Sequence, residues 1–139
     1  MNNDLYLKTC HISIEELINL YKNNKIDMWY SNDNFYNWNI KQKTILIESI
    51  LLNIPIQTIH MVQNKNNIFN LIGNSEILAT IFQFIGIYKN KNNELVKPLM
   101  LENENLPKFD KLTWENLNKK QKSDFKNFKI TIILICKKQ

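Results

Sequence analysis

The sequence predicts an α+β fold: a single domain with a small mixed sheet and about four helices. Three observations predict it. Helix-capping patterns precede apolar residues at helical spacing, alternating segments flank a short polar turn, and a β-branched run lies near the end of the chain. A chain of 139 residues is long enough to bury one core. Glycine and proline are scarce and no internal repeat is visible, so one domain is expected over residues 1–139.

The first predicted helix follows Ser13, whose hydroxyl can cap a helix, with Glu16 three residues later as in a capping box. Apolar residues then recur at helical spacing, at Ile14, Leu17, Ile18 and Tyr21. The polar residues 23–25 are expected to end this helix. Residues 26–30 are expected to form a short strand, and residues 31–37 a loop.

The second predicted helix begins after Asn39, which has Gln42 three residues later. Apolar side chains crowd the next ten residues on most sides, which is typical of a helix buried around most of its girth. Pro55 is expected to end the helix, because the residue before a proline is pushed out of helical space.

The middle of the chain predicts a hairpin followed by a third helix. Residues 56–62 alternate as a strand, residues 63–67 form the turn, and residues 68–72 return as a second strand. Residues 73–75 are expected to form a tight junction into a helix over residues 77–88.

The C-terminal third is more polar. Residues 90–93 are expected to be a loop and residues 95–101 an extended segment, placed at an edge by Pro98. A lysine-rich helix is expected over residues 113–128. The β-branched run 130–135 predicts a buried strand.

Two surface features suggest binding. Lys119, Lys120, Lys122 and Lys126 form a basic stretch that could contact nucleic acid, although a solvated helix face explains the same pattern. Five aromatic residues near the second helix suit either core anchoring or a protein-binding patch. They are Trp29, Tyr30, Phe35, Tyr36 and Trp38.

Metal, disulfide and membrane sites are not indicated. Cys10 and Cys136 lack metal-ligand spacing and are expected to be free thiols, and His11 and His60 lack any ligand pattern. Neither a metal nor a cofactor is expected. The chain shows no signal peptide and no membrane-spanning run, so a cytoplasmic or virion-associated location is expected. The abundance of Asn, Ile and Lys indicates an AT-rich genome, such as that of a virus.

The order of elements resembles the N-terminal domain of GmrSD-type (type IV) restriction enzymes, a nucleotide-hydrolysing domain distantly similar to the ParB and sulfiredoxin fold. The resemblance is carried by Trp38, by the segment 46–56 (Leu-Ile-Glu-Ser-Ile-Leu-Leu-Asn-Ile-Pro-Ile), and by the hairpin and following helix. It covers residues from about Ile12 to Ile135. The segment 46–56 is a packing motif rather than a chemical one.

The residues that carry the family's chemistry are replaced. The family's Gln-Arg pair aligns with Asp33 and Asn34, and its Asp-Gly-Gln-Gln-Arg motif aligns with Gly73, Asn74, Ser75, Glu76 and Ile77. All 18 basic residues are lysines, so no arginine can form a bidentate contact with phosphate. The resemblance therefore implies a vestigial nucleotide pocket, formed by Asp33, Asn34, Trp38, Gly73, Asn74, Ser75, Glu76 and Thr80.

The resulting expectation is a domain without catalysis that binds a protein partner or itself, within a larger viral or defence assembly. The family normally carries a C-terminal nuclease half. This chain is expected either to be a stand-alone remnant put to a new use or to work with a separate partner. Two alternatives stay open. One is a nucleotide-binding subunit of a DNA restriction system, and the other is a lysine-mediated DNA-binding protein, which the net charge of +5 permits.

Overall fold

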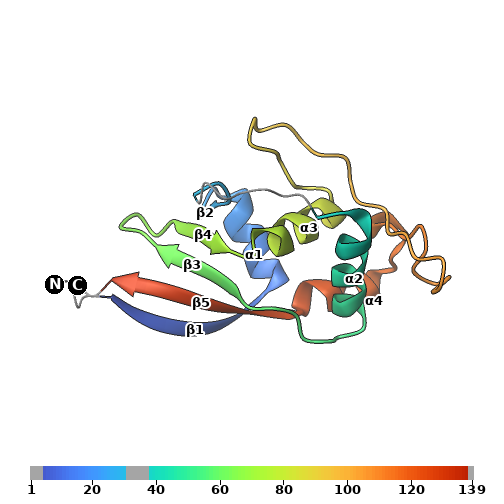
Figure 1. Ribbon diagram of the computed structural model, residues 1–139, viewed down its shortest axis with the longest axis horizontal. Coiled ribbons are helices and arrows are strands. Elements are labelled where there is room, and N and C mark those ends of the chain that lie inside the picture. The colour runs from blue at the N-terminus through green and yellow to red at the C-terminus, as the bar shows by residue number, and fades with distance from the viewer. Residues whose placement is uncertain (1–4, 31–37, 138–139) are drawn as a thin grey trace. The chain divides into compact units, whose positions relative to one another are not determined.

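The computed structural model describes residues 5–30 and 38–137. Within these residues the fold is α+β, with a five-stranded mixed sheet and four α-helices (Figure 1). The fold class predicted from the sequence is confirmed. None of the described helices is both long enough and apolar enough to cross a membrane.

The chain forms two compact units that alternate along the sequence. The first contains the whole sheet and helix α1, and the second contains α2, α3 from Glu76 onward, and α4. The first unit is built from Met1–Phe35, Gln57–Ser75 and Lys129–Gln139, and the second from Tyr36–Ile56 and Glu76–Phe128.

The sheet of the first unit has the strand order β1-β5-β3-β4-β2. Strands β3 and β4 form a hairpin. Strand β5 lies parallel to β3 on one side and antiparallel to β1 on the other (Figure 1). The strands are β1 (Leu5–Ser13), β2 (Ile26–Asp27), β3 (Ile59–Gln63), β4 (Phe69–Gly73) and β5 (Lys129–Lys137). The predicted hairpin is confirmed, with β3 starting three residues later than expected.

Strand β5 has one buried face and one half-buried face. Ile130, Ile132, Leu134 and Cys136 are buried, while the residues between them are half-buried. The β-branched run predicted a buried strand, and burial is complete on one face of β5 only. Alternating burial is typical of a sheet covered more fully on one side than on the other.

Helix α1 (Ile14–Lys22) begins and ends as the sequence predicts. The Ser13 hydroxyl accepts a hydrogen bond from the Glu16 N–H at 3.1 Å. At the other end Asn24 adopts a left-handed backbone with φ of 59°, and the Lys25 N–H donates to the Leu20 carbonyl at 2.8 Å. These contacts are a Schellman cap.

Strand β2 is shorter than predicted. It covers only Ile26–Asp27, because the Asp27 carboxylate accepts a hydrogen bond from the Trp29 N–H at 2.9 Å and turns the chain. The expected loop over residues 31–37 lies outside the described residues.

Helix α2 (Ile40–Leu51) opens the second unit with the predicted capping box between Asn39 and Gln42. Its end differs from the prediction. Asn53, with φ of 58°, ends the helix in a second Schellman cap, two residues before Pro55. Proline therefore does not end this helix.

Burial around α2 is also narrower than predicted. Ile45 is 53% exposed, so the helix is amphipathic rather than buried on most sides. Its buried face includes two polar residues that meet the loop after residue 101. The Thr44 hydroxyl accepts from the Glu102 N–H at 3.1 Å, and the Glu48 carboxylate accepts from the Asn103 amide at 2.6 Å.

Helix α3 (Ser75–Ile85) is the third predicted helix, and it ends at Gly86, whose φ of 93° closes a third Schellman cap. The segment 95–101 forms no strand, and only an isolated bridge joins Lys89 to Leu95.

The predicted helix over residues 113–128 is two elements. A 3₁₀ turn, η1 (Trp114–Asn116), is followed by helix α4 (Lys119–Asn127). Leu117 has an extended backbone between them, and Asn118 caps α4 by accepting from the Gln121 N–H. Helical spacing across the two elements hid this break, because a cap residue and a helix-interior residue can both be Asn.

Candidate functional site

The junction between β4 and α3 is where the resemblance places a nucleotide. Asn74 adopts a left-handed backbone with φ of 59°, and its side-chain amide donates to the Thr58 carbonyl at 2.6 Å. A Cβ placed on Gly73 would lie 3.4 Å from the His60 ring, so that ring already occupies one side of the junction. Ser75 is buried and begins α3. Each residue thus has a structural role in the turn.

The electrostatics of this junction do not favour a polyphosphate. A helix N-terminus attracts anions through its free N–H groups, but Glu76 places a carboxylate in the first turn of α3. Thr80 is buried one turn further along the helix, and Trp38 is half-buried just before the cap of α2. Asp33 and Asn34 lie outside the described residues. Of the predicted pocket residues, those at the turn lie together because they are consecutive in the sequence: Gly73, Asn74 and Ser75.

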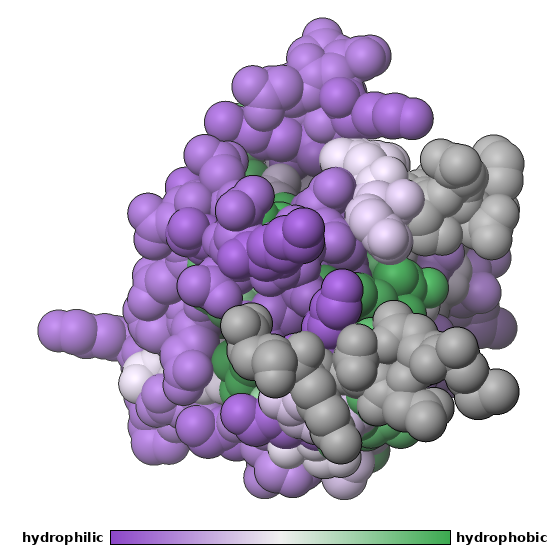
Figure 2. Space-filling view, turned by 90° about the vertical axis from the view of Figure 1, so that its left-hand side faces the viewer, coloured by the Kyte–Doolittle hydropathy of each residue, from purple (hydrophilic) through white to green (hydrophobic). Residues whose placement is uncertain are grey.

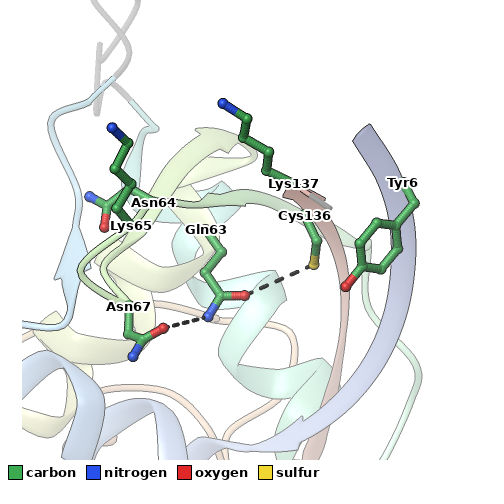
Figure 3. A pocket seen from close by; sticks show the side chains of 7 residues that line it. All are labelled: Tyr6, Gln63, Asn64, Lys65, Asn67, Cys136 and Lys137. Atoms are coloured by element: carbon green, nitrogen blue, oxygen red, sulfur yellow. Dashed lines mark hydrogen bonds between the residues drawn. The ribbon is translucent and has the colours of Figure 1, made fainter. Parts of the chain in front are cut away.

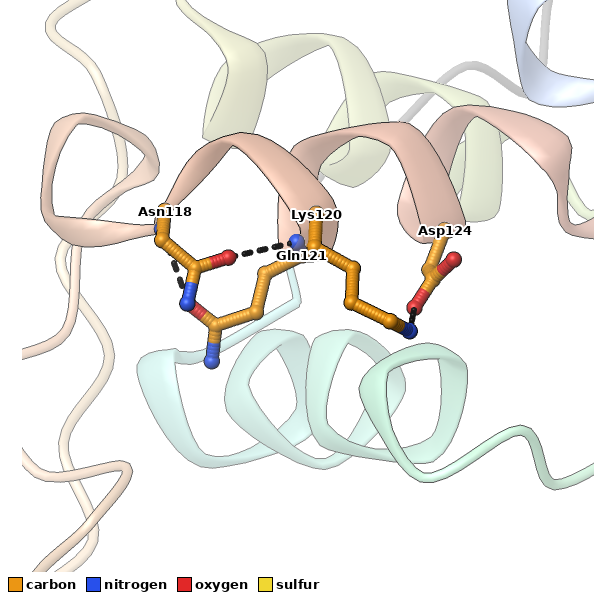
Figure 4. Close-up of polar contacts among 4 residues, drawn as sticks. All are labelled: Asn118, Lys120, Gln121 and Asp124. Atoms are coloured by element: carbon orange, nitrogen blue, oxygen red, sulfur yellow. Dashed lines mark hydrogen bonds and ion pairs between the residues drawn. The ribbon is translucent and has the colours of Figure 1, made fainter.

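The predicted basic stretch lies on α4, where Figure 4 shows the cap and the ion pair. Lys120 and Asp124 form an exposed pair at 2.9 Å, and the hydrogen bond to Asp124 raises the pKa of Lys120. Lys122 and Lys126 lie over the Trp114 ring, with Nζ 5.7 Å and 5.9 Å from its centroid. Of the four predicted lysines, three therefore have intramolecular partners, which leaves less free charge than the sequence suggests.

A hollow of about 700 Å³ lies on the sheet between the ends of β1 and β5 and the turn after β3 (Figure 3). Three of its seven side chains are amides. Gln63 donates to Asn67 at 3.1 Å and accepts weakly from the Cys136 thiol at 3.9 Å. The amides of Gln63 and Asn67 thus bond to one another, and the Asn64 side chain accepts from the backbone N–H groups of Asn66 and Ile68. Its remaining lining residues are Tyr6, Asn64, Lys65 and Lys137.

Cysteine and histidine form no reactive group in the described part of the chain. Cys10 and Cys136 are both free thiols. His11 shares a hydrogen bond with Thr131 at 3.1 Å. Across residues 5–30 and 38–137, no three His, Cys, Asp or Glu side chains gather as metal ligands would.

The most accessible binding feature is the free edge of β1. All nine residues of β1 pair with β5 in unbroken register, and no other described strand pairs with β1. Three large apolar side chains at its start are solvent-exposed: Leu5 by 57%, Tyr6 by 45% and Leu7 by 69%. Figure 2 shows the side of the molecule that lies at the left of Figure 1, and its surface is mostly hydrophilic with hydrophobic areas of limited size.

The two edges of this sheet differ in how they are protected. Proteins usually shield edge strands by making them short, or by adding proline, bulges or charges. The β2 edge is only two residues long, whereas β1 has nine residues, no proline, and Lys8 as its only Lys, Arg, Asp or Glu. An edge of this kind can accept a further strand through its main-chain N–H and C=O groups.

Sequence analysis missed β1 altogether. Its segment, Leu-Tyr-Leu-Lys-Thr-Cys-His-Ile-Ser, has aromatic and β-branched residues but no clear alternation of apolar and polar positions. The available signal was the absence of glycine and proline over these nine residues, which is weak. Comparison of the chain with protein-family models, curated proteins and solved structures finds no match. The resemblance to the GmrSD-type domain stays a prediction.

Proposed function

We propose that this chain is a protein-binding module that accepts a partner strand at the edge of β1 and does not hydrolyse nucleotides. The observation that carries the proposal is the nine-residue edge, which is free of bulges and has three exposed apolar side chains at one end. Backbone hydrogen bonds give such an edge affinity, and side chains such as Leu5 and Leu7 give it specificity.

The loss of nucleotide chemistry supports this proposal. Phosphoryl transfer depends on positioned positive charge, and the chain has no arginine. Asn74 replaces the glycine of the family motif at a left-handed backbone position, which asparagine tolerates better than most residues. On this reading the scaffold of an ancestral nucleotide-binding domain is kept while its ligand groups are gone.

Lysine-mediated DNA binding is a weaker candidate. Phosphate contacts need lysines that are free to neutralise charge. In α4, Lys120 is paired with Asp124, while Lys122 and Lys126 lie over Trp114.

Site-specific photo-crosslinking in the native host tests the proposal. A photoreactive amino acid replaces Leu7 in one variant and Leu95, which is 63% exposed in the other unit, in a matched control. We expect discrete protein adducts from position 7 and none of the same mass from position 95. The absence of adducts at position 7, or the same adducts at both positions, would contradict the proposal.

A further inference from the structure

We infer that the strand accepted by β1 is β1 of a second copy of this chain, in antiparallel pairing, with Leu7 on the twofold axis. This inference rests on the proposed function, because it names the partner of the same edge. It makes the sheet continuous across two protomers. Antiparallel strands of the same sequence are self-complementary, as an interface between identical subunits related by a twofold axis requires.

An apolar row that crosses the sheet ends at this edge. Leu7 lies opposite Ile135 on β5, and Ile135 lies opposite Val62 on β3. Directly opposed residues share one face of a sheet, so the three side chains form a transverse row. Ile135 and Val62 are half-buried, whereas Leu7 is 69% exposed at the open end of the row. A second Leu7 placed opposite the first would continue the row into the other protomer.

Charge decides against the neighbouring register. If the axis passed through Lys8, the two Lys8 ammonium groups would face one another, and like charges directly opposite destabilise a strand pair. With the axis at Leu7, each Lys8 instead faces Tyr6 of the second copy, where an ammonium group can lie against an aromatic ring. Leu5 then faces Thr9, which has high β-propensity.

The accessible length of β1 limits the other registers. An axis at Thr9 would place Leu5 opposite Ser13, which is buried and caps α1. An axis at Tyr6 would pair only residues 5–7 of the described strand, whereas the axis at Leu7 pairs residues 5–9. The Leu7 register pairs only residues 5–9, all of which are solvent-exposed, and it opposes no like charges.

Such an interface is small. A stable complex usually buries on the order of 1,200–2,000 Å², and two five-residue strand segments bury less. We therefore expect a weak, concentration-dependent dimer rather than a permanent one. Measured by sedimentation velocity from micromolar to near-millimolar protein, the mass should rise from 16.6 kDa toward twice that value.

Two charge variants test where the contact lies. Leu7→Lys places like charges opposite one another on the axis, and it should remain a monomer over the whole range. Leu95→Lys makes the same change at a similarly exposed position of the other unit, and it should dimerise like the parent chain. Circular dichroism checks that both are folded. A parent chain that stays monomeric, or a Leu7→Lys variant that dimerises normally, overturns the inference.

Cysteine pairing tests the register. Facing residues of antiparallel strands have Cα atoms about 4.5–5.5 Å apart, within the range that a disulfide spans. In a Cys10→Ser background, Leu7→Cys should form a disulfide-linked dimer under mild oxidation, and a mixture of Leu5→Cys and Thr9→Cys chains should cross-link to each other. Tyr6→Cys should not link to itself. A dimer linked through Tyr6→Cys but not through Leu7→Cys overturns the Leu7 axis.

The two proposals can fail separately. If the purified chain is monomeric but position 7 crosslinks to a different protein in the host, then the second-copy inference is wrong and the proposed function stands. If position 7 yields no adduct and the chain is monomeric, both fail.

Discussion

Asn74 offers a direct measure of what the β4–α3 junction contributes to stability. Two features of this residue can be separated by substitution: its left-handed backbone, with φ of 59°, and its amide hydrogen bond to the Thr58 carbonyl. Asn74→Gly removes the hydrogen bond but fits the backbone. Asn74→Ala removes the hydrogen bond and also replaces asparagine by a residue that tolerates the left-handed backbone less well.

The two substitutions should therefore differ in size. Loss of one exposed hydrogen bond costs about 0.5–1.5 kcal/mol. A left-handed backbone costs a residue with a Cβ roughly 1–2 kcal/mol more than glycine, and asparagine less than alanine. We expect Asn74→Gly to lower the free energy of unfolding by about 1 kcal/mol, and Asn74→Ala by about 2–3 kcal/mol.

Asn93 provides the matched control. It has nearly the same backbone, with φ of 62°, but its side chain makes no hydrogen bond among the described residues. The difference between alanine and glycine should be similar at both positions, whereas Asn93→Gly should be nearly neutral. Urea denaturation with unchanged m-values is the assay. If Asn74→Gly lowers the free energy of unfolding as much as Asn74→Ala does, then the left-handed backbone does not account for the effect of substitution at this position, and our reasoning is refuted.

Three further results are expected. Phe125→Ala removes a buried ring whose centroid lies 5.6 Å from that of Phe84 and 5.4 Å from that of Trp114. In urea denaturation it should lower the free energy of unfolding by about 3–5 kcal/mol, whereas the exposed substitution Lys120→Ala should lower it by at most about 0.5 kcal/mol. Equal losses would argue against the packing role of Phe125. Burial lowers the pKa of Lys43, so the folded chain binds this proton more weakly than the unfolded chain. The free energy of unfolding of the wild type, relative to that of Lys43→Met, should therefore rise as the pH approaches 10.5. A difference that falls or stays constant with pH would contradict this prediction. Calorimetric titration of ATP, GTP and CTP with magnesium should give no saturable heat at millimolar nucleotide, and micromolar binding would restore the nucleotide-binding hypothesis.

At most left-handed backbone positions of the described residues this chain has asparagine, where many proteins have glycine. The chain has only two glycines, and within residues 5–30 and 38–137 five asparagines adopt positive φ, at positions 24, 53, 67, 74 and 93. Two of them close Schellman caps, and Asn74 forms the junction before α3. Asparagine is the residue besides glycine that most readily adopts this conformation. The abundance of asparagine thus serves the backbone of this fold.

Local contacts were the predictable part of this protein. The caps at Ser13 and Asn39 join residues three positions apart, and the β3–β4 hairpin joins two strands across a short turn, so the sequence shows both partners at once. The junction residues Gly73, Asn74 and Ser75 were identified for the same reason. The break between η1 and α4 was missed although Asn118 and Gln121 have the three-residue spacing of a capping box, the signal that identified Asn39.

The sequence by itself determined the α+β class, three of the helix starts and the hairpin. These features depend on short-range hydrogen bonds and on apolar spacing, whose residues lie close together in the sequence. Only the tertiary structure decided that Leu5–Ser13 is a strand, since its partner β5 lies more than a hundred residues away and its own side chains alternate poorly. The same holds for the open edge, because whether a strand has a neighbour on its far side depends on the whole sheet and not on the strand itself.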